Sequence, residues 1–162
     1  MPEIGVRPCG VADATTLRAI RLEALRDTPD AYGSTFADLS RWSPHRWREA
    51  ARDWNFYFGL LDGEEVGLAS GGWNDEAPGT HWLYAMYVAP RARGTGVADA
   101  LVEEVARWAR AVGGRHLYLH VTETVTRART FYGRLGFVPT GEMSTMTRDP
   151  SLRLLTMVRD LD

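Results

Sequence analysis

The sequence predicts an α/β (α+β) fold with a mixed, mostly antiparallel sheet of about seven strands flanked by about four helices. Three observations lead to this prediction. Short apolar runs of strand length alternate with longer segments whose apolar residues recur at helical spacing. Clusters of Gly, Pro and Asp separate these segments. The segments follow the order strand, two helices, three strands, helix, strand, helix and two strands, and no linker-like tract interrupts them. Residues 1–162 are therefore expected to form a single domain.

The first half of the chain is expected to supply three strands and two helices. The strands are predicted over residues 3–8, 54–61 and 66–73. The last two flank the turn signal Asp62-Gly63, which predicts a hairpin. The first helix follows Asp13, its predicted N-cap, and the second follows Ser43, with Pro44 at the first helical position. Residues 27–34 between the helices are rich in turn formers and indicate a loop.

The second half is expected to alternate strands and helices. A central strand is predicted over residues 81–89, because both of its alternating faces are apolar, and Pro90 ends it. The other strands are predicted over residues 116–121, 137–142 and 152–158. A long amphipathic helix over residues 97–112 precedes Gly113-Gly114, and a shorter one around residues 128–135 precedes Gly136.

Composition excludes several classes of protein. All 19 basic residues are Arg, so a Schiff-base lysine and the lysine-dependent phosphate loop of P-loop NTPases are both excluded. The formal net charge of −2 argues against nucleic acid or an anionic membrane as the partner. Cys9 is the only cysteine, so no disulfide and no metal site are expected, and Cys9 is interpreted as a core residue. Because neither a membrane-spanning run nor a signal-peptide pattern is found, a cytoplasmic location is predicted.

The segment that joins the central strand to the long helix carries the clearest chemical signal. It contains Arg91, Arg93, Gly94 and Gly96 directly before the helix N-terminus. Unpaired backbone N–H groups and the helix dipole favour an anion there. The two glycines let a phosphate approach the backbone, and the two arginines would add charged donors. The pattern indicates a site for a nucleotide-derived pyrophosphate, with a tight turn that binds no ligand as the structural alternative. A dinucleotide-binding fingerprint is excluded, because Asp99 takes the place of its third glycine.

Two motifs resemble those of the GNAT superfamily of acetyl-coenzyme A-dependent acyltransferases. One is Arg91-x-x-Gly94-x-Gly96 after the fourth strand, and the other combines residues 119–121 with Ala128-x-x-Phe131-Tyr132-x-x-x-Gly136-Phe137. The resemblance extends from the first helix to the last strand. It implies a GNAT-like fold, acetyl-CoA (coenzyme A) as the cofactor, and direct transfer of the acetyl group to a primary amine.

The resemblance also implies roles for particular residues. Backbone groups around Met86 and Val88 would meet the pantetheine arm and the thioester. The pyrophosphate would be wrapped by Arg93, Gly94, Thr95, Gly96, Val97 and Ala98, with Arg91 beside them. Two positions depart from the family pattern. Val125 stands where an Asn often contacts the cofactor, and Ala85 stands where an acidic residue often serves as the catalytic base.

Two catalytic residues are predicted. Tyr132 matches the usual proton donor of the family, with a core aromatic residue as the alternative interpretation. His120 lies at the position where the ribosomal-protein N-terminal acetyltransferases of the family carry a Glu base. Its ordinary pKa near 6.5 suits that task. A buried histidine that bonds a backbone carbonyl is the alternative. Further candidates for the base are Glu23, Asp38, His81 and Glu123.

The acceptor is expected to bind beneath the first two helices and the loop between them. That loop carries Tyr32, Phe36 and Asp38, with Trp42 and Trp47 beyond it, which predicts an apolar-walled pocket. The leading hypothesis is a small-molecule amine as the acceptor, a metabolite or an antibiotic. A protein or peptide N-terminus and a non-catalytic CoA-binding sensor are the alternatives. The sequence leaves open whether the chain forms a homodimer.

Overall fold

The computed structural model describes residues 1–162 and contains a seven-stranded sheet in the order β1-β2-β3-β4-β5-β7-β6. The strands are β1 (Ile4–Pro8), β2 (Phe56–Leu61), β3 (Glu64–Trp73), β4 (His81–Val88), β5 (His116–Thr122), β6 (Val138–Met146) and β7 (Asp149–Asp160). Neighbouring strands are antiparallel except β4 and β5, which are parallel. The predicted mixed, mostly antiparallel sheet is confirmed.

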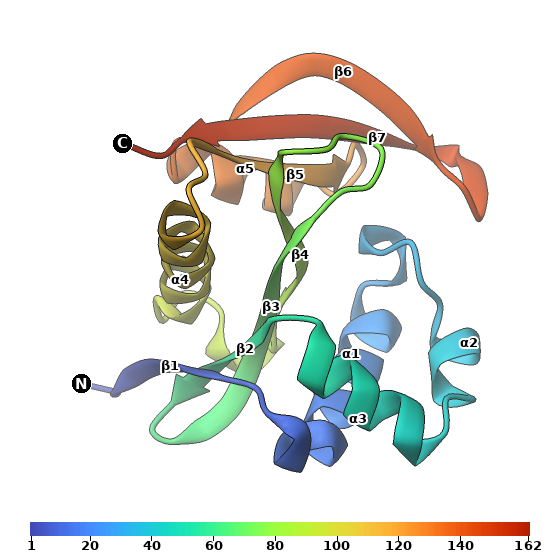
Figure 1. Cartoon of the computed structure of the whole chain (residues 1–162), viewed down its shortest axis with the longest axis vertical. Coiled ribbons are helices and arrows are strands. Elements are labelled where there is room, and N and C mark those ends of the chain that lie inside the picture. The colour runs from blue at the N-terminus through green and yellow to red at the C-terminus, as the bar shows by residue number, and fades with distance from the viewer.

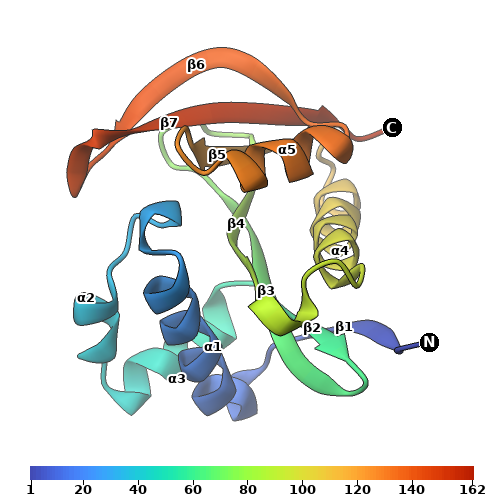
Figure 2. The same ribbon diagram turned by 180° about the vertical axis from the view of Figure 1, so that it is seen from behind.

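Five α-helices accompany the sheet, one more than predicted. They are α1 (Ala14–Asp27), α2 (Phe36–Ser40), α3 (Pro44–Asp53), α4 (Val97–Ala111) and α5 (Thr126–Arg134). Helix α2 was not predicted, because five residues are too few to show helical periodicity. Figures 1 and 2 show α1, α2 and α3 on one side of the sheet and α4 and α5 on the other. None of the helices has the length and apolar character needed to cross a membrane.

Two apolar clusters hold these layers together. On one side, Leu101 and Val105 of α4 pack against the sheet with no exposed surface. On the other side, Leu17 of α1 packs with Phe58 and Leu68 of β2 and β3, and all three are fully buried. The central strands of the sheet are therefore covered on both faces, whereas β6 at its edge is almost wholly exposed.

The centre of the sheet is interrupted. Strands β4 and β5 pair only through His81 with Leu117 and Trp82 with Tyr118, and then separate. The register between β3 and β4 shifts between Leu68 and Ser70. Within this irregular stretch of β4, Ala85 has a φ of +54°, a left-handed conformation that is uncommon for a residue other than glycine. Backbone strain of this kind gathers at functional sites, so the opening between β4 and β5 is where a site is expected.

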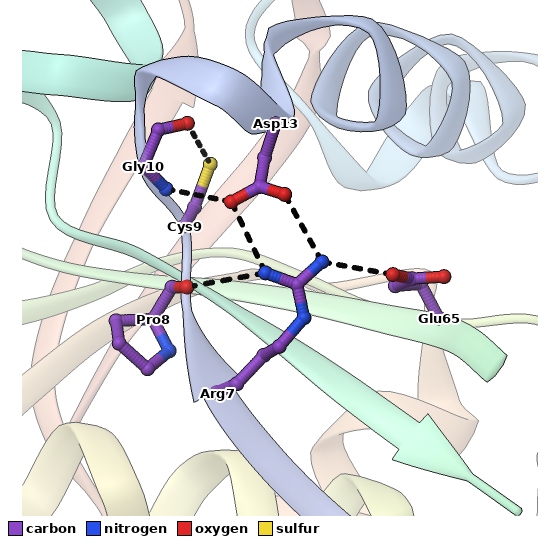
Figure 3. Close-up of polar contacts among 6 residues, drawn as sticks. All are labelled: Arg7, Pro8, Cys9, Gly10, Asp13 and Glu65. Atoms are coloured by element: carbon purple, nitrogen blue, oxygen red, sulfur yellow. Dashed lines mark hydrogen bonds and ion pairs between the residues drawn. The ribbon is translucent and has the colours of Figure 1, made fainter. Parts of the chain in front are cut away.

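The N-terminal junction departs from the prediction for Asp13, whose side chain does not cap α1. Its carboxylate reaches back and accepts a hydrogen bond from the Gly10 N–H at 2.9 Å. It also accepts two bonds from the Arg7 guanidinium, each at 3.1 Å, and Arg7 in turn pairs with Glu65 at 2.8 Å. Figure 3 shows this network, which joins β1, β3 and the start of α1. Cys9 beside it is partly buried, and burial raises the pKa of its thiol to about 11, so the thiol stays protonated.

Candidate active site

A cavity of about 680 Å³ lies where β4 and β5 separate. The residues of these two strands that line it are Leu83, Tyr84, Ala85, Met86, His120, Val121 and Thr122. Other walls come from both sides of the sheet, with Arg21 of α1 on one side and Tyr132 of α5 on the other. A cavity of this size suits a small molecule.

Tyr132 reaches this cavity from helix α5. Only 8% of the residue is exposed, and its ring packs edge-on against Phe137 with 5.7 Å between the ring centroids. Burial raises the pKa of the Tyr132 hydroxyl above its ordinary value, because the charged phenolate is poorly solvated there. The hydroxyl therefore stays protonated at neutral pH and can act as a donor.

His120 enters the cavity from β5. Its Nδ1 lies 3.3 Å from the Thr156 Oγ1 of β7, and its ring contacts the Trp82 ring at a tilt of 39°, with 4.6 Å between the centroids. The residue as a whole is exposed, yet the surrounding side chains partly desolvate the imidazole and lower its pKa below 6.5, although Glu142 and Glu76 oppose the shift. The imidazole is therefore mostly neutral at pH 7, which is the state in which it can accept a proton.

The turn before α4 has the conformation expected of an anion site. Gly94 has a φ of +80° and Gly96 a φ of +99°, and both values strongly favour glycine. The N–H groups of Gly94, Thr95, Gly96, Ala98 and Asp99 donate no hydrogen bond within the chain. The turn leads directly into the positive end of a helix of 15 residues. Free amides, glycines and a helix N-terminus together fit a pyrophosphate.

Comparison with known proteins assigns this arrangement to a family. Residues 17–137 match the model of the acetyltransferase (GNAT) family. The chain belongs to this family. A GNAT enzyme uses acetyl-CoA, and the glycine turn described above fits the pyrophosphate of that cofactor. No curated protein matches the chain by sequence.

Solved structures agree with this GNAT assignment. Ribosomal-protein-alanine N-acetyltransferase from Brucella melitensis is 26% identical, with a TM-score of 0.75, over 97% of this chain and 99% of that one. A GCN5-related N-acetyltransferase from Kribbella flavida is 24% identical, with a TM-score of 0.76, over 98% of both chains. The protein yncA from Salmonella typhimurium, solved with its cofactor acetyl-CoA, is 22% identical, with a TM-score of 0.74, over 99% of this chain and 95% of that one. The last two show the likeness of fold.

The residues predicted to meet the cofactor in this GNAT domain differ in whether the protein itself already engages their polar groups. Arg91 is exposed and forms no ion pair, so it can turn toward an anion. Arg93 is already engaged, since it pairs with Asp27 at 2.7 Å and donates to the Val88 carbonyl at 3.1 Å. The Met86 carbonyl accepts a hydrogen bond from the Tyr32 hydroxyl at 2.7 Å. Arg93 therefore shapes the turn rather than presenting a free charge.

The predicted acceptor residues are only partly brought together. Tyr32 lines the cavity, whereas Phe36 and Asp38 lie outside it. The reason is the short helix α2, whose N-cap Thr35 accepts a hydrogen bond from the Asp38 N–H. This turn leaves Asp38 exposed, and the Phe36 ring packs under Arg26 of α1 at 4.7 Å. Trp42 and Trp47 also lie away from this cavity, beside a second one between α1 and α3.

The remaining candidates for the base have other partners and do not line the cavity. Glu23 accepts a hydrogen bond from the Tyr87 hydroxyl at 2.9 Å. Glu123 pairs with Arg153 at 2.8 Å. His81 is buried near the start of β4, with its ring 5.7 Å from that of Trp108. Of the histidines and carboxylates considered from the sequence, only His120 lines the cavity.

Both departures from the family pattern lie in the cavity wall, as Ala85 and Val125 line it. Sequence reasoning missed many other lining residues, among them Arg21, Trp54, Trp73 and Tyr84. For Arg21 a signal existed, because it lies four residues after Leu17 and three before Ala24, on the buried stripe of α1. A charged residue on a buried stripe needs either a partner or a function.

Proposed function

We propose that this GNAT enzyme transfers the acetyl group of acetyl-CoA directly to the primary amine of a small molecule. One observation carries the proposal: Tyr132 and His120, selected separately from the sequence, line the same cavity of about 680 Å³. Aromatic and aliphatic side chains form most of the remaining wall, and polar groups are few. Such a cavity suits an organic molecule more than a long polymer.

In this proposal the cofactor binds along β4 and the turn that follows. The free amides of Gly94, Thr95, Gly96 and Ala98 would hold the pyrophosphate, with Val97 between them at the helix start, and Arg91 would add charge from the surface. Met86 and Val88 border the thioester end. When bound, acetyl-CoA supplies the activated acetyl group, and the chain supplies position and proton transfer.

His120 takes the proton from the incoming amine. We assign to His120 the tautomer whose Nδ1–H donates to the Thr156 Oγ1, because this tautomer leaves the Nε2 lone pair free to accept that proton. Neither Ala85 nor Val125 can replace it, since neither side chain titrates. His120 is thus assigned as the general base.

Tyr132 donates a proton to the leaving thiolate. With ordinary pKa values of about 10 and 8.5, this transfer is uphill by roughly 2 kcal/mol in water. Burial raises the pKa of Tyr132 further, but it also raises that of a thiolate held in the same cavity. The transfer therefore stays within reach, and Tyr132 remains protonated until it is needed.

A peptide N-terminus is the second candidate acceptor. It is favoured by the similarity to the Brucella melitensis enzyme and by the position of His120. The chain is further proposed to act as one domain over residues 1–162 in the cytoplasm, with neither nucleic acid nor a membrane as its partner. Whether it forms a homodimer is left to measurement by light scattering.

Thiol release from acetyl-CoA tests the proposed function. Purified protein is assayed with a panel of small primary amines, with peptides and without an acceptor, while calorimetry measures CoA binding. Acetylation of small amines supports the proposal, and mass spectrometry identifies the product. Acetylation of peptides alone would favour the second candidate. Binding of CoA without transfer to any acceptor would identify a sensor and refute the proposal.

A further inference from the structure

Arg21 is the only arginine that lines the central cavity. Its guanidinium lies 4.9 Å from the centroid of the Tyr32 ring. Tyr32 in turn is fixed by the hydrogen bond from its hydroxyl to the Met86 carbonyl of β4. Arg21 therefore stands against the same wall as the backbone that borders the thioester end of the cavity.

The Arg21 side chain makes no ion pair, and its buried Nη1 has no hydrogen-bond partner. The carboxylates of its own helix are engaged elsewhere, Glu23 by Tyr87 and Asp27 by Arg93. Burial lowers the pKa of Arg21, yet a guanidinium keeps its proton at any physiological pH. The face of the Tyr32 ring offsets part of this charge, but no carboxylate of the protein neutralises it, so the wall carries a positive charge without a counterion. Leaving such a charge unpaired is costly unless a ligand neutralises it.

No other charged group in the cavity neutralises Arg21. The only carboxylate that lines it belongs to Asp53, which pairs with Arg52 at 2.7 Å and is exposed. A polycationic acceptor would therefore meet repulsion from Arg21 and find no free carboxylate. An acceptor that carries its own anion would find a partner, and a guanidinium binds a carboxylate through two parallel N–H···O bonds.

We infer that the acceptor is a small amino acid-like molecule, an amine with a nearby carboxylate, and that Arg21 binds this carboxylate. This inference rests on the proposed function and names its substrate class. Phe56, Trp54, Trp73 and Tyr84 line the same cavity, so the remainder of the acceptor is apolar or aromatic. Arg21 acts as a specificity residue, since it holds the acceptor and takes no part in proton transfer.

Matched acceptors test the inference with the unaltered protein. L-Phenylalanine is compared with 2-phenylethylamine, which lacks the carboxylate, and with L-phenylalaninamide, which replaces it. L-Leucine, isoamylamine and L-leucinamide form a second set. The amide and the amine differ in the pKa of the amino group, so an effect of nucleophile ionisation is separated from an effect of the carboxylate.

We expect kcat/KM to be about 10- to 100-fold higher for the amino acid than for both matched compounds, chiefly through KM. Equal or better use of the uncharged compounds would overturn this inference and leave the proposed function standing. Binding of CoA without acetylation of any acceptor would overturn both.

Variants of Arg21 assign the effect to this residue. Arg21→Gln should raise KM for the amino acid by about 10- to 100-fold and change kcat/KM for the amine by no more than about twofold. Arg18→Gln, on the exposed side of α1 one turn earlier, is the matched control and should leave both unchanged. If Arg21 only supports Tyr32, both acceptors lose activity equally. Arg21→Lys, which keeps the charge, should retain part of the preference and serves if Arg21→Gln fails to fold.

Discussion

Replacing His120 with Ala is the sharpest test of how the acceptor amine loses its proton. At an ordinary pKa of 6.5, about three quarters of the imidazole is neutral at pH 7, and partial desolvation of the ring, which lowers the pKa, raises that fraction. A base of this kind typically contributes 10²- to 10⁴-fold, which corresponds to about 3–5 kcal/mol of transition-state stabilisation. Below its pKa, activity should fall about tenfold for each pH unit.

His120→Ala should lower the free energy of unfolding by less than it lowers transition-state stabilisation. The tilted ring contact with Trp82 contributes about 0.5–1.5 kcal/mol, and the hydrogen bond with Thr156 contributes a similar amount. His120→Ala should therefore remain folded at 25 °C, which circular dichroism verifies. Thr156→Val is the matched control, because it keeps the imidazole and removes only its partner. It should lower kcat/KM by about 2- to 13-fold and keep the fall in kcat/KM below the pKa of His120, the acid limb of the pH profile.

The assay is kcat/KM from thiol release between about pH 5 and 9, for the wild type and both variants. We expect His120→Ala to lose both the rate and the limb that lies below pH 6.5. Ionisation of the amine itself gives a second, more alkaline limb that all three proteins should share. A near-normal rate with an intact lower limb in His120→Ala would show that the base lies elsewhere.

Three further outcomes are expected. Tyr132→Phe should lower kcat on the order of 10²-fold or more while calorimetry shows unchanged CoA affinity; normal turnover with reduced stability would instead make Tyr132 a core residue. Gly96→Val should weaken CoA binding by about tenfold or more, whereas Gly79→Val, with a φ of +83° in an open turn, should strain the backbone equally and leave binding unchanged. Asp13→Asn should reduce the free energy of unfolding by about 1 kcal/mol at pH 7. Hydrogen bonds from Arg7 depress the pKa of Asp13, so its contribution is present above pH 3.8 and is lost as the pH falls through the folded value. Urea titrations at pH 7 and pH 3 should show a smaller difference between the two proteins at the lower pH.

The sequence was sufficient for the sheet and most of the helices, because periodicity and turn residues are local signals. Ser43 and Pro44 illustrate this, since the Ser43 side chain accepts a hydrogen bond from the Arg46 N–H as predicted for an N-cap. Asp13 illustrates the limit. Its side chain has the right chemistry for a cap, but the Arg7 guanidinium from β1 competes for it. No local pattern predicts a partner from a neighbouring strand.

The site was predictable where a motif fixed the backbone and less so where packing placed a side chain. The glycine turn has the conformation that its residues require, as the positive φ values of Gly94 and Gly96 show. By contrast, Phe36 and Asp38 were assigned to the cavity from their position in a loop, and the unpredicted α2 turns them away from it. The position of Arg21 on the buried stripe of α1 indicates a partner or a function, but a helix position alone does not reveal which group lies opposite it.

The separation of β4 and β5 has a consequence for stability as well as for chemistry. Beyond Trp82, the edge of β4 that faces β5 has no strand partner, so an extended ligand with amide groups can add to it as a short strand would. Bound pantetheine would then join four strands on one side to three on the other. A ligand that binds only the folded chain stabilises it by about 2.7 kcal/mol at a hundredfold excess over Kd. The melting temperature should therefore depend on how much coenzyme is present, and the coenzyme should slow hydrogen exchange at the β4 amides that it covers.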